Sequence, residues 1–216
     1  MHVLVLSGSR NREGQTARGI HSICKGLDTG GATSEVIFLP ELKLERCRQC
    51  DPSGDGLCTR KGRCIVKDDF PTIVEKINEA DAVVFATPVY FMDLTESMRG
   101  FLDRYRRVRF HRVIAGGGIG AAPAQPAKPA IAYCYAGGMS GNGTTSCGNN
   151  INGILGQCGF DVVDVILARR QNLEFKIPIL ELTGEWFATK PISGPTLAPS
   201  ERYWARSENN EDDDTA

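Results

Sequence analysis

Residues 3–9 of the chain read Val-Leu-Val-Leu-Ser-Gly-Ser, an uninterrupted apolar run that ends in a small polar turn. Such a run is typical of a β-strand that is buried on both faces, as in a parallel sheet covered by helices. Apolar residues then recur with helical spacing over residues 16–27, with Ile20, Ile23 and Leu27 on one side. A buried strand followed at once by an amphipathic helix opens a βαβ unit, so this stretch predicts an α/β fold.

The alternation of strand and helix patterns continues along the chain. Short apolar runs predict strands at residues 35–39, 82–86, 130–135 and 162–167, and helical spacing predicts helices at 70–80, 97–108 and 151–158. Asp69 is expected to cap the first of these helices. Strands joined by helices form right-handed crossovers and a parallel sheet. Five such strands predict a doubly wound, flavodoxin-like sheet in the order 2-1-3-4-5.

The length of 216 residues suits one domain with appendages. We expect this domain over residues 1–170, with a cysteine-rich loop at 46–66. An extended C-terminal arm over 171–206 and a disordered acidic tail over 207–216 are expected to follow, because the tail carries only acidic charges. Residues 115–129 (AGGGIGAAPAQPAKP) are so rich in Gly, Ala and Pro that they predict a mobile loop.

The composition argues against two classes of partner. A net charge of −1 does not indicate a broad nucleic-acid-binding surface. No apolar run approaches the ~18 residues of a membrane span. The apolar run at residues 3–6 is also too short for the core of a signal peptide. These features predict a cytoplasmic protein without nucleic-acid or membrane partners.

Three segments that follow predicted strands have the composition of ligand-binding loops. Ligands of a doubly wound sheet bind beyond the carboxyl ends of its strands. Residues 7–16 (SGSRNREGQT) place hydroxyls, a base and a glycine before a helix N-terminus. This arrangement suits a phosphate, although an ordinary polar loop has the same composition.

The other two segments suit a flat ring. Residues 87–91 (TPVYF) offer apolar and aromatic side chains on which a ring could lie, the alternative being a core patch under the next helix. Residues 136–143 (AGGMSGNG) contain enough glycine for the backbone to approach a ligand closely. All three segments are predicted at one edge of the sheet, which makes a shared ligand site the best interpretation.

The order of these motifs resembles a known family. The sequence runs from GSR…GQT through a cysteine-rich segment, a DD pair, EADAVVFATPVYF and a helix containing FLDR to a glycine-rich turn after KPAIAY. Over residues 1–167 this is similar to the NAD(P)H-dependent FMN reductase and iron–sulfur flavoprotein family. The resemblance implies FMN as cofactor, with its phosphate at Ser9, Arg10, Gln15 and Thr16. It also implies that the flavin ring lies against Pro88, Val89, Tyr90, Phe91, Gly137 and Gly138.

Four of the eight cysteines lie close together, at Cys47, Cys50, Cys58 and Cys64. Four thiolates in one loop can hold a [4Fe–4S] cluster or a tetrahedral zinc ion, and a redox disulfide or free thiols are the remaining alternatives. The resemblance favours the cluster, because iron–sulfur flavoproteins of the family have a compact four-cysteine loop in the same place. The gap between Cys50 and Cys58 is wider than their usual pattern, and residues 51–57 look like a turn inserted there.

The leading functional hypothesis is an FMN-dependent oxidoreductase with a [4Fe–4S] cluster. It would pass electrons between a small organic substrate or NAD(P)H and an acceptor such as a one-electron carrier. One alternative is a flavin–cluster dehydrogenase that oxidises a chorismate-derived ring in secondary metabolism. Another is a non-enzymatic zinc-binding redox sensor or interaction module. A homodimer or homotetramer is expected, and the sequence nominates no acid–base catalytic residue.

Overall fold

The computed structural model describes residues 1–52, 56–115, 127–138 and 142–189. Its centre is a parallel sheet of five strands in the order β2-β1-β3-β4-β5. The strands are β1 (His2–Ser7), β2 (Thr33–Phe38), β3 (Ala82–Pro88), β4 (Lys128–Ala136) and β5 (Phe160–Arg169). The predicted flavodoxin-like sheet and its strand order are confirmed.

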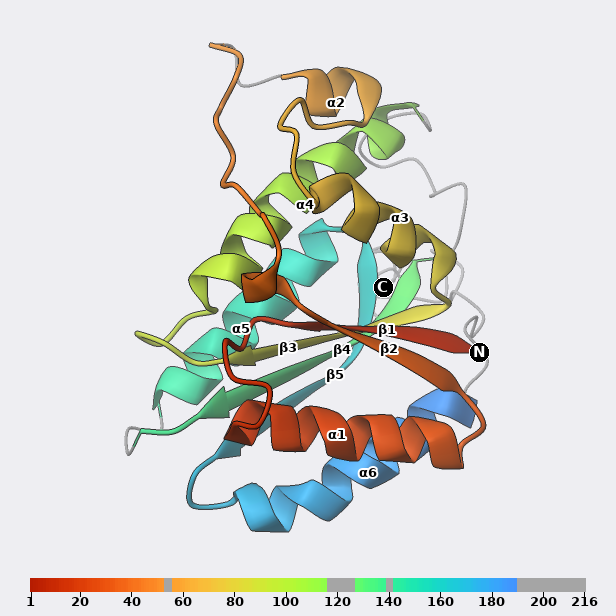
Figure 1. Cartoon of the computed structure of the whole chain (residues 1–216), viewed down its shortest axis with the longest axis vertical. Helices are drawn as coiled ribbons and strands as arrows, with labels where there is room; N and C mark the ends of the chain where they lie inside the picture. The colour runs from red at the N-terminus through yellow and green to blue at the C-terminus, as the bar shows by residue number, and fades with distance from the viewer. Residues whose placement is uncertain (53–55, 116–126, 139–141, 190–216) are drawn as a thin grey trace, which may run out of the picture.

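Helices cover both faces of this sheet (Figure 1). One face carries α1 (Gln15–Thr29) and α6 (Leu173–Thr189), and the other carries α3 (Phe70–Glu79), α4 (Glu96–Ala115) and α5 (Asn142–Gln157). The short 3₁₀ turn η1 (Leu39–Glu41) follows β2, and the short helix α2 (Leu57–Lys61) packs against α4. Among the described residues, no helix is long and apolar enough to cross a bilayer.

The apolar run that opens the chain supplies both layers of the core. Leu4 and Leu6 of β1 point into the cluster formed with α3, α4 and α5, whereas Val3 and Val5 point into the cluster with α1 and α6. All four side chains are fully buried. Successive side chains of a strand point to opposite faces, so only an uninterrupted apolar run can satisfy two covered faces. This is the physical reason why the first strand predicted the fold.

The C-terminal part of the fold differs from the expectation of an arm over residues 171–206. Residues 173–189 form α6, which lies along α1 (Figure 1). Pro178 lies inside this helix and interrupts the pattern by which a helix is recognised in a sequence. Residues 190–206 and the predicted tail lie outside the described residues.

Two glycines allow the backbones of α1 and α6 to touch. A Cβ on Gly26 would lie 1.8 Å from the carbonyl oxygen of Glu181, and a Cβ on Gly184 would lie 2.2 Å from that of Ile23. No side chain fits into either space. Because of this close contact, α6 packs with α1 as one helical layer on this face of the sheet.

Two local expectations are also corrected. Asp69 precedes α3 but makes no side-chain cap; instead its Oδ2 accepts a hydrogen bond from the backbone N–H of Lys43, at 2.8 Å. The predicted loop over 115–129 is shorter at both ends, because Ala115 belongs to α4, and Lys128 and Pro129 belong to β4. The remaining residues 116–126 lie outside the described part of the chain.

Candidate functional site

The loop between β1 and α1 leads to a helix N-terminus without a cap. Gly14 occupies the N-cap position with an extended backbone, no side chain caps the helix, and its first turn holds no acidic residue. The N–H groups of a first helical turn have no partner within the helix, and the helix dipole makes this end positive. The entrance of α1 therefore offers backbone donors to an anion such as a phosphate.

Two of the four residues predicted to bind phosphate lie buried at this entrance. The side chains of Ser9 and Thr16 are almost fully buried. Ser9 Oγ accepts a hydrogen bond from the Asn11 amide and donates one to the Asn11 carbonyl, which fixes the curve of the loop. Hydroxyls at the entrance add donors to those of the backbone. The chemistry of this loop fits an anionic group.

The other two predicted residues have protein partners. Arg10 is exposed and forms an ion pair with Glu96 at the start of α4, with 3.6 Å between Nη2 and Oε2. Gln15 accepts a hydrogen bond from Arg18 through Oε1, at 2.8 Å. The structure thus brings Ser9 and Thr16 to the helix entrance, but it directs Arg10 toward α4. Phosphate binding by these residues stays a prediction.

The loop after β3 presents an aromatic surface. Pro88 is buried as the last residue of β3, and Val89 is held by a hydrogen bond of its N–H to the carbonyl of Tyr135, at 2.8 Å. Tyr90 is half exposed and the side chain of Phe91 is fully exposed. Phe91 and its neighbour Met92 both have positive φ angles, of 49° and 66°, which large side chains rarely adopt. Two backbone hydrogen bonds between Tyr90 and Asp93, at 3.1 and 2.9 Å, close this tight turn and hold Phe91 at its tip.

The glycine-rich turn after β4 leaves open space at the same edge of the sheet. Among the described residues beyond the chain neighbours, a Cβ on Gly138 would meet no atom within 4 Å, and one on Gly137 would meet only the ring of Tyr135, at 3.9 Å. Thr144, in the first turn of α5, has a buried Oγ1 without a hydrogen-bond partner in the described part of the chain. Bare backbone and an unpaired hydroxyl fit a ligand with polar ring atoms. Residues 139–141 of the predicted turn lie outside the described residues.

A buried network of hydroxyls supports these loops, and the sequence did not predict it. Thr87 Oγ1 donates to the carbonyl of Pro88 at 2.9 Å and accepts from the N–H of Thr95 at 3.2 Å. Gly8 packs against the same network, because a Cβ there would lie 2.3 Å from Thr95 Oγ1. The network joins the ends of β1 and β3. No pattern in the sequence connects Thr87 to Thr95, so only the fold reveals the pair.

The cysteine-rich segment is anchored at both ends by one arginine of α4. Arg104 Nη1 donates to Asp68 Oδ2 at 2.5 Å and to the carbonyl of Glu45 at 2.8 Å. Asp68 Oδ2 also accepts from the N–H of Glu45, at 2.8 Å. Both charged side chains are at least 97% buried, with 2% and 3% of their surface exposed. The segment between residues 45 and 68 therefore leaves and rejoins the core at a single buried ion pair.

Within this segment, three of the four predicted metal ligands line one small pocket. Cys47, Cys50 and Cys58 share it with Arg107. Gly56 makes room for two of the sulfurs: the position of a Cβ on Gly56 lies 3.1 Å from Cys50 Sγ and 3.6 Å from Cys58 Sγ. Burial is the largest influence on Cys58 and raises the pKa of its thiol.

The fourth ligand, Cys64, contacts a different arginine. Its sulfur accepts a hydrogen bond from Arg104 Nη2, at 3.4 Å. In the described part of the chain, no three His, Cys, Asp or Glu side chains converge closely enough to hold a metal ion. Zinc needs its sulfurs at about 2.3 Å from one point. A four-iron cluster uses the same thiolate donors, so the donor chemistry of the four cysteines is compatible with either group.

Three of the four remaining cysteines, Cys134, Cys147 and Cys158, are core residues, whereas Cys24 on α1 is partly buried. Cys134 and Cys147 are fully buried with their sulfurs 3.7 Å apart, and burial raises the pKa of Cys158 to about 12. A thiol of such high pKa is inert at neutral pH.

Comparison with known proteins places these loops in a family context. The profile of a family described as NADPH-dependent FMN reductase matches residues 1–147. An iron–sulfur flavoprotein of Archaeoglobus fulgidus is 33% identical over 109 residues, or 50% of this chain and 51% of the relative. An iron–sulfur flavoprotein of Methanocaldococcus jannaschii is 30% identical over 109 residues, or 50% and 54%. The chain thus spans about half the length of the curated relatives it matches.

A solved structure supports the fold alone. The NAD(P)H:quinone oxidoreductase from Methanothermobacter marburgensis superposes with a TM-score of 0.65 at 18% identity, over 88% of this chain and 98% of that one. The match includes the flavodoxin-like arrangement of strands and helices described above.

Proposed function

The chain belongs to the NADPH-dependent FMN reductase family, and we propose that it is an oxidoreductase that binds FMN at the carboxyl edge of its sheet. The observation that carries this proposal is the convergence of three loops at that edge. They are the uncapped entrance of α1, the exposed aromatic turn after β3 and the open glycine turn after β4. All three lie within residues 1–147, the part of the chain that the family profile matches.

Each loop has its own task in this proposal. The first backbone N–H groups of α1 and the hydroxyls of Ser9 and Thr16 hold the phosphate of FMN. Tyr90 and Phe91 contact the apolar part of the ring, and the bare backbone at Gly137 and Gly138 faces its polar atoms. FMN, when bound, supplies electron transfer in pairs or singly. The protein orients the ring and limits access of water to it.

We also propose that Cys47, Cys50, Cys58 and Cys64 hold a [4Fe–4S] cluster. Two relatives that carry the name iron–sulfur flavoprotein support this proposal. The basic surroundings support it as well, since Arg107 lines the cysteine pocket and Arg104 donates to Cys64. Arginine side chains compensate the negative charge of a thiolate-bound cluster. Electrons then pass between NAD(P)H or a small organic substrate at the flavin and a one-electron partner at the cluster.

Anaerobic purification tests both cofactors at once. Flavin released by denaturation should chromatograph as FMN in about equal amount to protein, and iron and acid-labile sulfide should each approach about four atoms per chain. A folded protein that takes up no added FMN would refute the flavin site. Zinc without sulfide would refute the cluster and leave the flavin assignment intact.

A further inference from the structure

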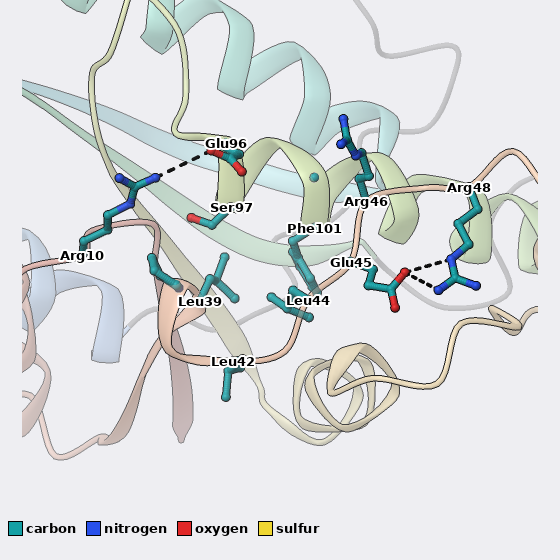
Figure 2. A pocket seen from close by; sticks show the side chains of 12 residues that line it. Arg10, Leu39, Leu42, Leu44, Glu45, Arg46, Arg48, Glu96, Ser97 and Phe101 are labelled. Carbon is teal, nitrogen blue, oxygen red and sulfur yellow. Dashed lines mark hydrogen bonds and ion pairs between the residues drawn. The ribbon is translucent and has the colours of Figure 1, made fainter.

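A pocket that shares only Arg10 with these loops lies between α4 and the extended segment that follows η1 (Figure 2). Its volume is about 730 Å³, within the ~300–1,000 Å³ that is usual for small-molecule sites. Three parts of the chain line it: Arg10 after β1, residues 39–48, and the first turns of α4. No cysteine lines this pocket, and Arg10 alone connects it with the candidate phosphate loop.

One wall of the pocket is apolar. Leu39 and Phe101 are almost fully buried behind it, and Leu42 and Leu44 are half buried and pack against the same core. Side chains of an extended segment alternate between two faces, so Leu42 and Leu44 lie on the pocket side of their segment. Gly100 of α4 keeps the opposite wall open, because a Cβ there would meet no atom within 4 Å.

The charges around the pocket leave one positive group without an ion pair. Arg48 is paired with Glu45, at 2.5 Å between Nη2 and Oε2, and Arg10 is paired with Glu96. Arg46 also lines the pocket and forms no ion pair with any residue in the described part of the chain (Figure 2). Three arginines against two glutamates give the pocket an excess of one positive charge.

We propose that this pocket binds a small organic monoanion, namely a carboxylate carried on an apolar ring or short chain. Arg46 pairs with the carboxylate, and the leucines contact the apolar body. A nucleotide or polyphosphate is a poorer match, because Glu45 and Glu96 would face its additional negative charges. The proposal goes beyond the proposed function, since it assigns a ligand class to a surface that holds neither the flavin ring nor the cysteines.

Calorimetric titration of the FMN-loaded protein tests this site. The probe is naphthalene-2-carboxylate, and the neutral control ligand is naphthalene-2-carboxamide. We expect the carboxylate to bind about three- to fivefold more tightly, because it alone can pair with Arg46, and an ion pair to an exposed arginine contributes only modestly. Arg46→Gln should reduce its affinity to that of the amide and leave the amide unchanged. Arg63→Gln, on an exposed arginine outside the lining, is the matched control and should change neither.

Gly100→Leu tests the location of the site without harming the fold. Leucine is a better helix former than glycine, so the thermal midpoint should not fall. Its side chain should fill the pocket and abolish binding of both probes while FMN remains bound. Equal binding of carboxylate and amide, or no binding, would overturn the proposal. If the probe still binds Gly100→Leu and shifts the flavin absorption, it binds at the flavin and not in this pocket. If the variant separates subunits that associate in the wild type, the pocket is an interface between copies of the chain. Either result also overturns the proposal.

Discussion

Arg104 and Asp68 form the most deeply buried ion pair among the described residues, although 35 residues lie between them in the sequence. The Arg104 guanidinium also lies over the ring of Phe70, 4.1 Å from its centre, and donates to Cys64. One side chain of α4 thereby holds both ends of the cysteine-rich segment and one of its proposed ligands.

Asp68→Asn should destabilise the protein markedly. The substitution leaves the buried guanidinium without its counter-charge, a change that usually costs about 3–5 kcal/mol. Urea denaturation at neutral pH measures the loss. Glu41→Gln, which breaks the exposed pair with Arg12, is the matched control and should have a far smaller effect. Similar effects of the two substitutions would contradict the structural role of the buried pair.

The contribution of this pair should depend on pH. Burial raises the pKa of Asp68, but hydrogen bonds from Arg104 and from the Glu45 amide outweigh it, so the pKa lies below its ordinary value. A carboxyl whose pKa is lower in the folded state stabilises the fold above its unfolded pKa, and this stability is lost as pH falls through the folded pKa. The difference in unfolding free energy between wild type and Asp68→Asn should therefore be full at neutral pH and shrink below about pH 4. A difference that stays constant down to about pH 3 would exclude this linkage.

The entrance of α1 can be tested by combining Arg10→Ala with Thr16→Val. We expect FMN affinity to fall by about 10–100-fold, the loss that follows from removing hydrogen bonds to a charged group. Riboflavin, which has no phosphate, should bind the double variant and the wild type alike. Fluorescence titration of the apoprotein measures both affinities. Lys25→Ala, further along the same helix and paired with Glu181, is the control, and unchanged FMN affinity in the double variant would exclude this loop.

Gly138→Val should block the ring and spare the fold. A Cβ at Gly138 has no atom of the described residues beyond its chain neighbours within 4 Å, so thermal stability without flavin should be nearly unchanged. The branched side chain would occupy space proposed for the ring, so affinities for FMN and riboflavin should fall together, by at least about tenfold. This common loss distinguishes the ring site from the phosphate loop. Normal affinity in the variant would rule out the proposed ring position.

Cys50→Ser should remove the cluster and leave the flavin. Serine is a poor iron ligand, so iron and sulfide content should fall to near background, whereas FMN content should stay that of the wild type. Stopped-flow measurement should then show flavin reduction without rapid transfer to a one-electron acceptor. Cys24→Ser, on α1, is the control and should keep both cofactors. Unchanged one-electron transfer in the Cys50 variant would limit the cluster to a structural role.

The sequence predicted those parts of the molecule that depend on local patterns. A short uninterrupted apolar run is typical of a doubly covered strand, so the runs at residues 3–6 and 82–86 predicted strands inside the sheet, which the structure confirms. The residue types that follow the strands at 3–6, 82–86 and 130–135 marked three candidate loops, whose role in ligand binding stays a prediction. Helix α6 was missed because its proline and outward apolar residues obscure the helical period.

Pairings between distant segments could not be predicted in the same way. The DD pair and the FLDR motif were recognised as separate signs of a family, yet Asp68 and Arg104 within them are partners. Their contact depends on the path of the chain from β2 to α3, which leaves no periodic pattern in the sequence. For the same reason, the pocket beside Arg46 becomes visible only when α4 is placed against the segment after η1.

The direct backbone contact between α1 and α6 determines which part of this chain can be moved into another protein scaffold. All three loops precede residue 147, so a chimera designed from the loops alone would stop near there. Such a chimera would contain α1 but not α6, the helix that touches the backbone of α1 at Gly26. Leu27 and the apolar side chains around it would then be exposed to water. The smallest portable unit therefore extends through residue 189. A host scaffold that replaces α6 must therefore place a residue without a side chain where Gly184 lies against α1.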